Sequence, residues 1–99
     1  MAIEILKNNQ IGVLTINRPD SLNAMNREIL LEFINGLKKI QSEKDIRVII
    51  ITGSGEKAFI AGADIKLMQK MNREEAFEFA NLGQELANLI EKSAKPVIA

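Results

Sequence analysis

The sequence predicts an α/β fold in which neighbouring strands run parallel. Two short apolar segments, residues 11–16 and 46–52, have the β-branched composition that is typical of strands. Between them, residues 26–41 place apolar side chains such as Ile29 and Phe33 on one face of a helix. A strand, a helix and a second strand form a βαβ unit, in which the strands are parallel and the crossover is right-handed.

The first residues predict a β-hairpin. Residues 3–6 and 11–16 are predicted as its two strands. Residues 7–10 form the turn, because they include two Asn, which tolerate the positive φ of a tight turn. Pro19 ends the second strand since it cannot donate to a ladder, and residues 21–26 form a loop before the helix.

The second half of the chain is predicted to hold a buried strand and two helices. Residues 46–52 show little alternation, which favours a strand covered on both faces. A turn at residues 53–57 follows, and Asp64 then caps a short helix over residues 65–71. A longer helix begins after Asn72.

This longer helix carries a reciprocal cap and two apolar stripes. Asn72 and Glu75 stand at capping-box positions. One stripe has small residues (Ala76, Ala80, Gly83, Ala87 and Ile90) and the other has large ones (Phe79, Leu82, Leu86 and Leu89). This broad apolar surface predicts a helix packed between two layers. Lys92 and Lys95 favour its C-terminal end.

The last residues predict the beginning of a further strand. Pro96 is acceptable at the start of a strand, and residues 97–99 continue it. A natural domain seldom stops at such a point. We therefore expect residues 1–99 to be an N-terminal fragment of a single domain, truncated at the start of a strand.

The composition excludes several classes of function. Lys+Arg and Asp+Glu are equal at 13 each, so the formal net charge is zero and the basic excess of a nucleic-acid binder is absent. No apolar run approaches the ~20 residues that span a bilayer, and the N-terminus lacks signal-peptide features. We expect a cytoplasmic protein without a nucleic-acid or membrane partner.

The missing residue types narrow the chemistry further. The chain has no Cys and no His, which excludes a thiol nucleophile, a Ser-His-Asp triad and Cys- or His-based metal sites. We therefore expect no metal. Carboxylates, Lys, hydroxyls and the backbone itself remain for catalysis.

The first candidate site is the glycine-rich turn. Residues 53–58 fit G-x-G-x-x-G/A directly after a strand, a pattern with which dinucleotide-binding folds hold a pyrophosphate. In those folds the helix begins inside the motif, whereas residues 59–62 are a poor helix start. The acidic residue expected ~20 positions later could only be Glu74 or Glu75, and both fit the first turn of a helix. A plain turn is favoured, with a dinucleotide-binding module as the alternative.

The second candidate site is Ala61-Gly62-Ala63-Asp64. Small side chains let a ligand approach the backbone. Backbone N–H groups held ~2.7–3.1 Å from a thioester oxygen stabilise the negative charge of an enolate-like transition state. The Ala63 N–H, at the start of the predicted helix, meets that need. These four residues alone favour the simpler alternative, a helix N-terminus after a tight turn.

Four segments together resemble motifs of the crotonase (enoyl-CoA hydratase/isomerase) family, in family order. They are Asn17-Arg18-Pro19 with Leu22-Asn23-Ala24-Met25, then Ile49-Ile50-Ile51-Thr52-Gly53, then Phe59-Ile60-Ala61-Gly62-Ala63-Asp64-Ile65-Lys66, and Lys95-Pro96-Val97-Ile98-Ala99. The resemblance covers essentially the whole chain. It implies the first turns of a crotonase-like ββα superhelix. The parent protein is most similar to an enoyl-CoA hydratase, including 3-hydroxybutyryl-CoA dehydratases, with the family's isomerases, hydrolases and synthases as alternatives.

The resemblance also implies roles for individual residues. The Ala63 N–H would be one of two oxyanion-hole donors to the thioester carbonyl of an acyl-CoA substrate. The residues implied to contact the CoA moiety are Ala61, Gly62, Ala63, Asp64, Ile65, Lys66, Leu22 and Ala24. Coenzyme A enters as part of the substrate, and no bound cofactor is implied. Family members are usually homotrimers or hexamers.

No general acid or base is expected within the chain. In hydratases of this family two glutamates move the protons, and the resemblance implies that their motifs and the second oxyanion donor lie beyond residue 99. The glutamates present, Glu56, Glu74, Glu75, Glu78 and Glu85, do not match those motifs and are expected to be solvated. The chain alone is therefore expected to be inactive. A third possibility is a structural fragment that associates through the unpaired edge at residues 97–99.

Overall fold

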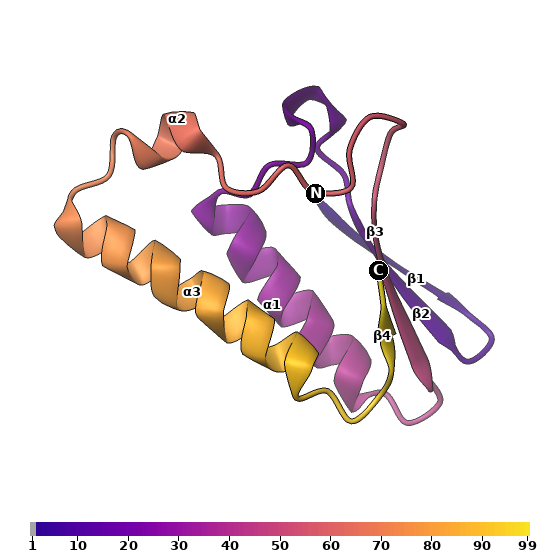
Figure 1. Ribbon diagram of the computed structural model, residues 1–99. Helices are drawn as coiled ribbons and strands as arrows, with labels where there is room; N and C mark the ends of the chain where they lie inside the picture. Colours follow the sequence, from indigo (N-terminus) through magenta and orange to yellow (C-terminus); the bar gives the residue numbers. More distant parts are fainter. Residues whose placement is uncertain (1) are drawn as a thin grey trace.

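An N-terminal hairpin and two successive parallel crossovers build a four-stranded sheet in the order β1-β2-β3-β4 (Figure 1). The computed structural model describes residues 2–99. Its elements are β1 (Ile3–Asn8), β2 (Ile11–Ile16), the 3-10 turn η1 (Pro19–Ser21), α1 (Arg27–Ser42), β3 (Val48–Gly53), α2 (Ile65–Met68), α3 (Arg73–Glu91) and β4 (Val97–Ile98). β1 is antiparallel to β2, whereas β2, β3 and β4 are parallel. The predicted α/β class and the parallel pairing across the helix are confirmed.

The hairpin is tighter than the sequence predicts. β1 continues to Asn8, which pairs with Ile11, so only Asn9 and Gln10 remain in the turn. Asn9 takes the predicted positive φ, at 56°. The register brings Ile3 opposite Ile16 and buries both side chains toward the helices.

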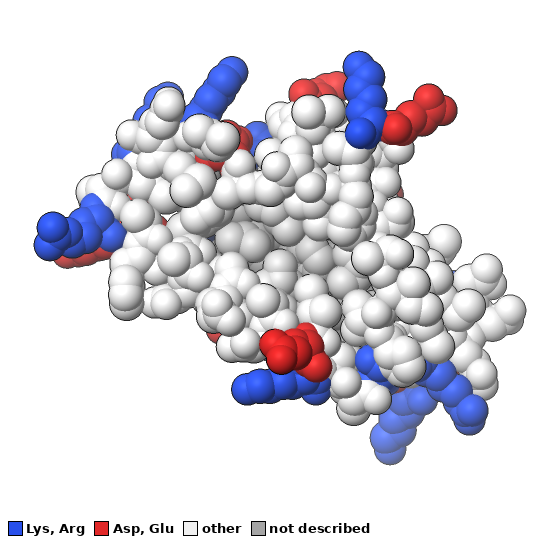
Figure 2. All heavy atoms as spheres, viewed as in Figure 1, with Lys and Arg blue, Asp and Glu red and all other residues white. Residues whose placement is uncertain are grey.

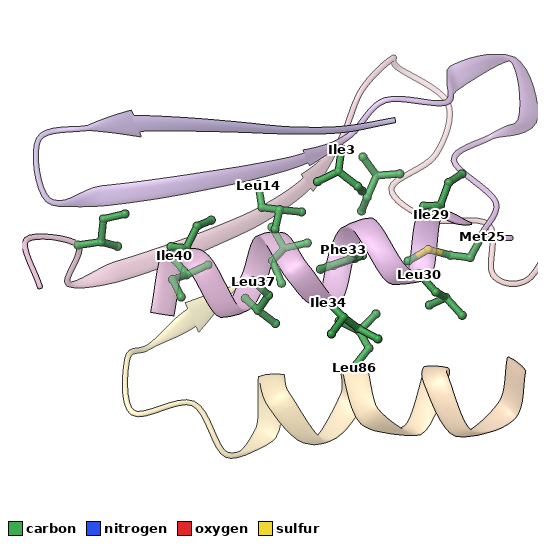
Figure 3. Close-up of a cluster of buried hydrophobic side chains, with 14 of the residues drawn as sticks. Ile3, Leu14, Met25, Ile29, Leu30, Phe33, Ile34, Leu37, Ile40 and Leu86 are labelled. Atoms are coloured by element: carbon green, nitrogen blue, oxygen red, sulfur yellow. The ribbon is translucent and has the colours of Figure 1, made fainter. Parts of the chain in front are cut away.

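Helix α1 lies between the sheet and α3, which makes three layers (Figure 3). Asn26 caps it, because its side chain accepts a hydrogen bond from the Ile29 N–H at 2.8 Å. Its buried residues are Ile29, Leu30, Phe33, Ile34, Gly36, Leu37 and Ile40. With both sides of this one helix covered, α1 supplies the centre of the hydrophobic core.

The described residues cover strand β3 on one face, which corrects the prediction of a strand covered on both. Ile49 and Ile51 are buried, whereas Val48 and Ile50 between them are half-buried. Helices α1 and α3 lie on the same side of the sheet (Figure 1). Within residues 2–99 no other helix packs on the opposite face.

Helix α3 likewise packs on one side. Its capping box between Asn72 and Glu75 is confirmed. Phe79 and Leu86 are buried in the core, but three residues of the small stripe, Ala76, Ala80 and Ala87, are exposed. The predicted position between two layers is therefore not formed by the described residues.

Figure 2 shows that charged side chains stand at the edges of the viewed face, while uncharged residues fill its middle.

Lys95 caps a different helix from the one predicted. Its ammonium donates to the carbonyl oxygens of Ile40, at 3.1 Å, and of Glu43, both at the C-terminal end of α1 rather than α3. The turn between α3 and β4 brings the side chain there.

Among the described residues no helix is both long enough and apolar enough to cross a membrane.

Candidate active site

The Ala61 to Asp64 segment is held against the early loop by a short backbone ladder. The Met25 N–H donates to the Gly62 carbonyl oxygen at 2.7 Å, and the Asp64 N–H donates to the Met25 carbonyl oxygen at 2.7 Å. One step earlier, the Ala61 N–H donates to the Leu22 carbonyl oxygen at 3.1 Å. Met25 and Ala63 thus form an isolated parallel bridge.

This ladder determines where the Ala63 N–H points. In a parallel bridge, the N–H and C=O of one residue bond to the two residues that flank its partner. The partner's own N–H and C=O point away from the bridge. Met25 uses Gly62 and Asp64, so the Ala63 N–H is directed away from Met25. No atom of residues 2–99 accepts a hydrogen bond from it. Ala63 therefore presents a donor that the fold itself does not use.

The short helix after Ala63 contributes less than the sequence suggests. Helix α2 covers only Ile65–Met68, shorter than the predicted 65–71, because the Lys70 and Met71 N–H groups bond three residues back and form a turn. Asp64 is its N-cap, as predicted. Ala63 precedes that cap, so the ladder rather than the helix start orients its N–H.

Gly62 supplies the conformation that brings the chain into the ladder. Its φ is +101°, and no atom lies within 4 Å of a Cβ built there. Glycine adopts this positive φ at little cost, whereas other residues are strained by it. The requirement for Gly at this position is therefore conformational, not a lack of space.

A buried asparagine joins the two loops. Asn23 is 1% exposed, and its Oδ1 accepts from the Arg18 N–H at 2.8 Å. Its Nδ2 donates to the carbonyl oxygens of Ser54 (2.9 Å), Ala58 (3.1 Å) and Phe59 (3.1 Å). Sequence reasoning assigned no role to Asn23. The feature of the sequence that could have indicated such a role is an amide side chain in a loop between apolar residues, Leu22 before it and Ala24 and Met25 after it.

An ion pair between Arg18 and Asp64 also joins the two loops. The Arg18 Nη2 lies 3.2 Å from the Asp64 Oδ2, and the Arg18 Nη1 donates to the Ala24 carbonyl oxygen at 2.9 Å. Asp64 Oδ1 accepts from the Leu67 N–H at 3.3 Å. Both carboxylate oxygens of Asp64 thus have partners within the protein, and Arg18 is a further residue that sequence reasoning missed.

Seven of the eight predicted site residues line one groove of about 600 Å³; these are Leu22, Ala24, Ala61, Ala63, Asp64, Ile65 and Lys66. The eighth, Gly62, lies in the ladder behind it. Three cations, Arg18, Lys66 and Lys70, and two carboxylates, Asp20 and Asp64, also border the groove. The balance is one positive charge, which suits an anionic ligand.

An apolar cavity of about 400 Å³ adjoins Ala63 between α2 and α3. Met25, Met68, Met71 and Phe79 are among its lining residues. Ala63 is the one residue that lines both this cavity and the charged groove. The unused Ala63 N–H therefore lies where a polar space and an apolar space meet.

The other two candidates give no comparable arrangement. No helix begins within residues 53–58, and Gly55, with φ +86°, belongs to a turn, so the dinucleotide motif lacks its helix. The five glutamates considered above are all exposed. Three have structural partners: Glu75 closes the capping box, Glu78 pairs with Arg27, and Glu85 lies 3.8 Å from Lys38.

Comparison with known proteins shows the family to which the chain belongs. The family model described as enoyl-CoA hydratase/isomerase matches residues 6–99. A crotonyl-CoA hydratase of Syntrophomonas wolfei is 46% identical over 94% of this chain, and a short-chain-enoyl-CoA hydratase of Clostridium acetobutylicum is 42% identical over 94%. The chain spans 36% of the length of each of these relatives.

Solved structures match equally well. The crystal structure of an enoyl-CoA hydratase from Bacillus anthracis superposes with a TM-score of 0.92 at 32% identity, over 98% of this chain and 38% of that one. An enoyl-CoA hydratase from Thermoplasma volcanium gives 0.91 at 37% identity, with the same coverage. The fold is that of the N-terminal part of crotonase structures, and the chain belongs to the enoyl-CoA hydratase/isomerase family.

Proposed function

We propose that this chain is the acyl-CoA-binding N-terminal part of an enoyl-CoA hydratase, which catalyses the reversible syn hydration of a 2-enoyl-CoA to a 3-hydroxyacyl-CoA. The observation that supports it most directly is the unused Ala63 N–H at the meeting point of a charged groove and an apolar cavity. A fatty acyl thioester of coenzyme A has the same division, because its acyl chain is apolar and its CoA moiety carries phosphates.

The chemistry fits this division. Addition of water at the β-carbon of an enoyl thioester places negative charge on the thioester oxygen. A preorganised backbone donor at that oxygen raises kcat by a factor of about 10²–10³. The Ala63 N–H would be one such donor. Arg18, Lys66 and Lys70 would attract the CoA phosphates, and the apolar cavity would hold the acyl chain.

The names of the relatives favour a hydratase. Two matched relatives are called crotonyl-CoA hydratase and short-chain-enoyl-CoA hydratase, so short enoyl-CoA substrates are the first to test. The family's description also includes isomerases. An isomerase, hydrolase or synthase activity on acyl-CoA is therefore the second candidate.

The proton-transfer groups are proposed to lie in residues that follow Ala99 in a longer protein, together with the second oxyanion donor. The observation behind this proposal is that Glu75, Glu78 and Glu85 are exposed and engaged in caps or ion pairs. The longer protein is proposed to be a cytoplasmic homotrimer or hexamer, and the 99-residue chain is expected to have no hydratase activity.

Turnover and calorimetry test these proposals. The longer protein should hydrate crotonyl-CoA, and the 99-residue chain should not. Acetoacetyl-CoA should bind to the longer protein, and NAD should not. Hydration by the 99-residue chain would show that its own carboxylates suffice. Binding of NAD without any CoA thioester would overturn the whole proposal in favour of a dinucleotide-binding module.

A further inference from the structure

We propose that Asn23 is a positioning residue for the oxyanion donor, and that its amide sets the geometry in which the Ala63 N–H meets the thioester oxygen. This inference rests on the proposed function. Asn23 itself does not border the charged groove or the apolar cavity described above. Its effect on the reaction would therefore pass through the backbone of the two loops.

The position of Asn23 in the chain makes it the link between two pieces of backbone. Its Nδ2 binds the Ser54 carbonyl, where the second loop leaves β3, and the Ala58 and Phe59 carbonyls, just before the ladder begins. Its neighbour Leu22 accepts the first ladder bond, from the Ala61 N–H at 3.1 Å. The amide thus fixes both ends of the segment that leads into Ala63.

The surroundings of Asn23 require an amide in particular. One side of the group must accept from the Arg18 N–H, and the other must donate to carbonyl oxygens. An aspartate has a similar shape and can still accept, but an ionised carboxylate would face three carbonyl oxygens with no proton to offer. Asn23 also has a φ of +59°, which Asn and Asp tolerate better than most residues. The change Asn23→Asp therefore removes the donor while it preserves shape and backbone preference.

The surroundings of Gly53 show that the two loops are tightly packed around Asn23. A Cβ added at Gly53 would lie 2.7 Å from the Asn23 Nδ2 and 2.0 Å from the Phe59 carbonyl oxygen. The last residue of β3, the amide and the Phe59 backbone are therefore packed against one another. Loss of the amide leaves the Phe59 carbonyl oxygen without this donor, so the loop must shift to regain one.

The test uses the longer protein that contains this chain, in three variants. N23D removes the donor, and N23G removes the whole side chain but tolerates the positive φ. The control is N81D, which makes the same change at an exposed position of α3. A misplacement of about 1 Å costs up to about 10²-fold in rate. We expect kcat for crotonyl-CoA to fall about 10- to 100-fold in N23D and N23G.

Ground-state binding should change much less, because a saturated thioester develops no oxyanion. The Kd for butyryl-CoA should rise by less than about threefold in both Asn23 variants, and N81D should match the wild type. A purely structural role would lower the melting temperature and leave kcat per folded molecule unchanged at temperatures well below it. That result would overturn the proposal.

Hydrogen–deuterium exchange separates this inference from the proposed function. Amide exchange in peptides that cover residues 22–26 and 60–65 should be faster in both Asn23 variants, and unchanged in N81D. If the wild-type protein hydrates no enoyl-CoA, the proposed function fails, while faster exchange still supports Asn23 as the residue that holds the ladder. Unchanged exchange in N23D and N23G would overturn the positioning role whatever the activity.

Discussion

Gly53 approaches Phe59 so closely that a Cβ atom added at Gly53 would lie 2.0 Å from the Phe59 carbonyl oxygen. The end of strand β3 is therefore packed directly against the backbone that leads to Ala63. The same glycine is the first residue of the G-x-G-x-x-G/A pattern at residues 53–58. Its role in the fold is a close contact between two stretches of backbone.

The substitution Gly53→Ala should destabilise the protein. The obstructing atom belongs to the backbone and cannot rotate away, so the loop must move, at a cost of about 1–3 kcal/mol. The control is Gly83→Ala in α3, where no atom lies within 4 Å of the added Cβ. That variant should be more stable than the wild type by up to about 1 kcal/mol. Thermal unfolding of both variants checks the two signs, and equal shifts would contradict the packing described for Gly53.

Replacement of the Ala63 amide by an ester should separate catalysis from stability. This change, made by semisynthesis of the longer protein, removes the N–H and keeps the side chain. No described residue accepts a bond from that N–H, so the melting temperature should fall only slightly, through the weaker bond that the Gly62 carbonyl, now an ester carbonyl, accepts from the Met25 N–H. The value of kcat for crotonyl-CoA should fall about 10²–10³-fold.

An ester at Ala61 provides the matched control. The Ala61 N–H donates to the Leu22 carbonyl oxygen, so its removal should lower the free energy of unfolding by about 0.5–1.5 kcal/mol. If the Ala63 ester were instead the more destabilised of the two and kept full activity, the N–H of Ala63 would be a structural group and not a catalytic one.

Lys95→Ala should weaken the end of helix α1. The half-buried Lys95 ammonium donates to the Ile40 carbonyl oxygen, and its loss leaves a C-terminal carbonyl of α1 without that cation. We expect a loss of about 1 kcal/mol in the free energy of unfolding. Lys92→Ala, at the exposed end of α3, should cost clearly less. Chemical denaturation of the two variants measures the difference, and the reverse order would contradict the assignment.

The surface pair of Lys7 and Asp45 should give a small dependence of stability on pH. The hydrogen bond from the Lys7 ammonium holds the pKa of Asp45 below its ordinary value of 3.8. A carboxyl whose pKa is lower in the folded state adds stability above its unfolded pKa, and this stability is lost as the pH falls through the folded value. The pH window therefore lies below about 3.8.

Melting temperatures of the wild type and of Asp45→Asn measure this effect. The wild type should be the more stable at pH 7, and the gap should shrink as the pH falls below the window's upper limit. In a Lys7→Gln background the same substitution should change the pH profile less, because only a backbone hydrogen bond and Lys95 then still lower the pKa of Asp45. A gap that widens on acidification would contradict the sign.

The secondary structure was predictable wherever the signal is local. Helix α1 begins and ends within one residue of the predicted 26–41, because the Asn26 cap and the apolar periodicity both lie in the sequence. Strand β3 begins later than predicted. Ile46 is apolar and 1% exposed, but its N–H bonds to the Glu43 carbonyl in a turn.

The segment that forms the site was predictable from the sequence, but the contacts that orient the Ala63 N–H were not. The small residues from Ala61 to Ala63 marked the place, and the family resemblance marked the donor. The pairing with Met25 and the amide of Asn23 were missed because both depend on contacts between residues distant in sequence. The expected covering of both faces of β3 and α3 failed for a related reason, since apolar composition does not reveal which faces meet within residues 2–99.

The bridge between Met25 and Ala63 has a consequence for how this site can vary. A one-residue slip in such a pairing reverses the side to which every group points. A single insertion or deletion between Phe59 and Ala63 that shifts this register would turn the Ala63 N–H toward Met25 and put the N–H of a neighbouring residue in its place. Substitution of Ala63 by another small residue would leave the donor in place. The site is thus encoded in the length of a loop more strictly than in the identity of the residue that carries the donor.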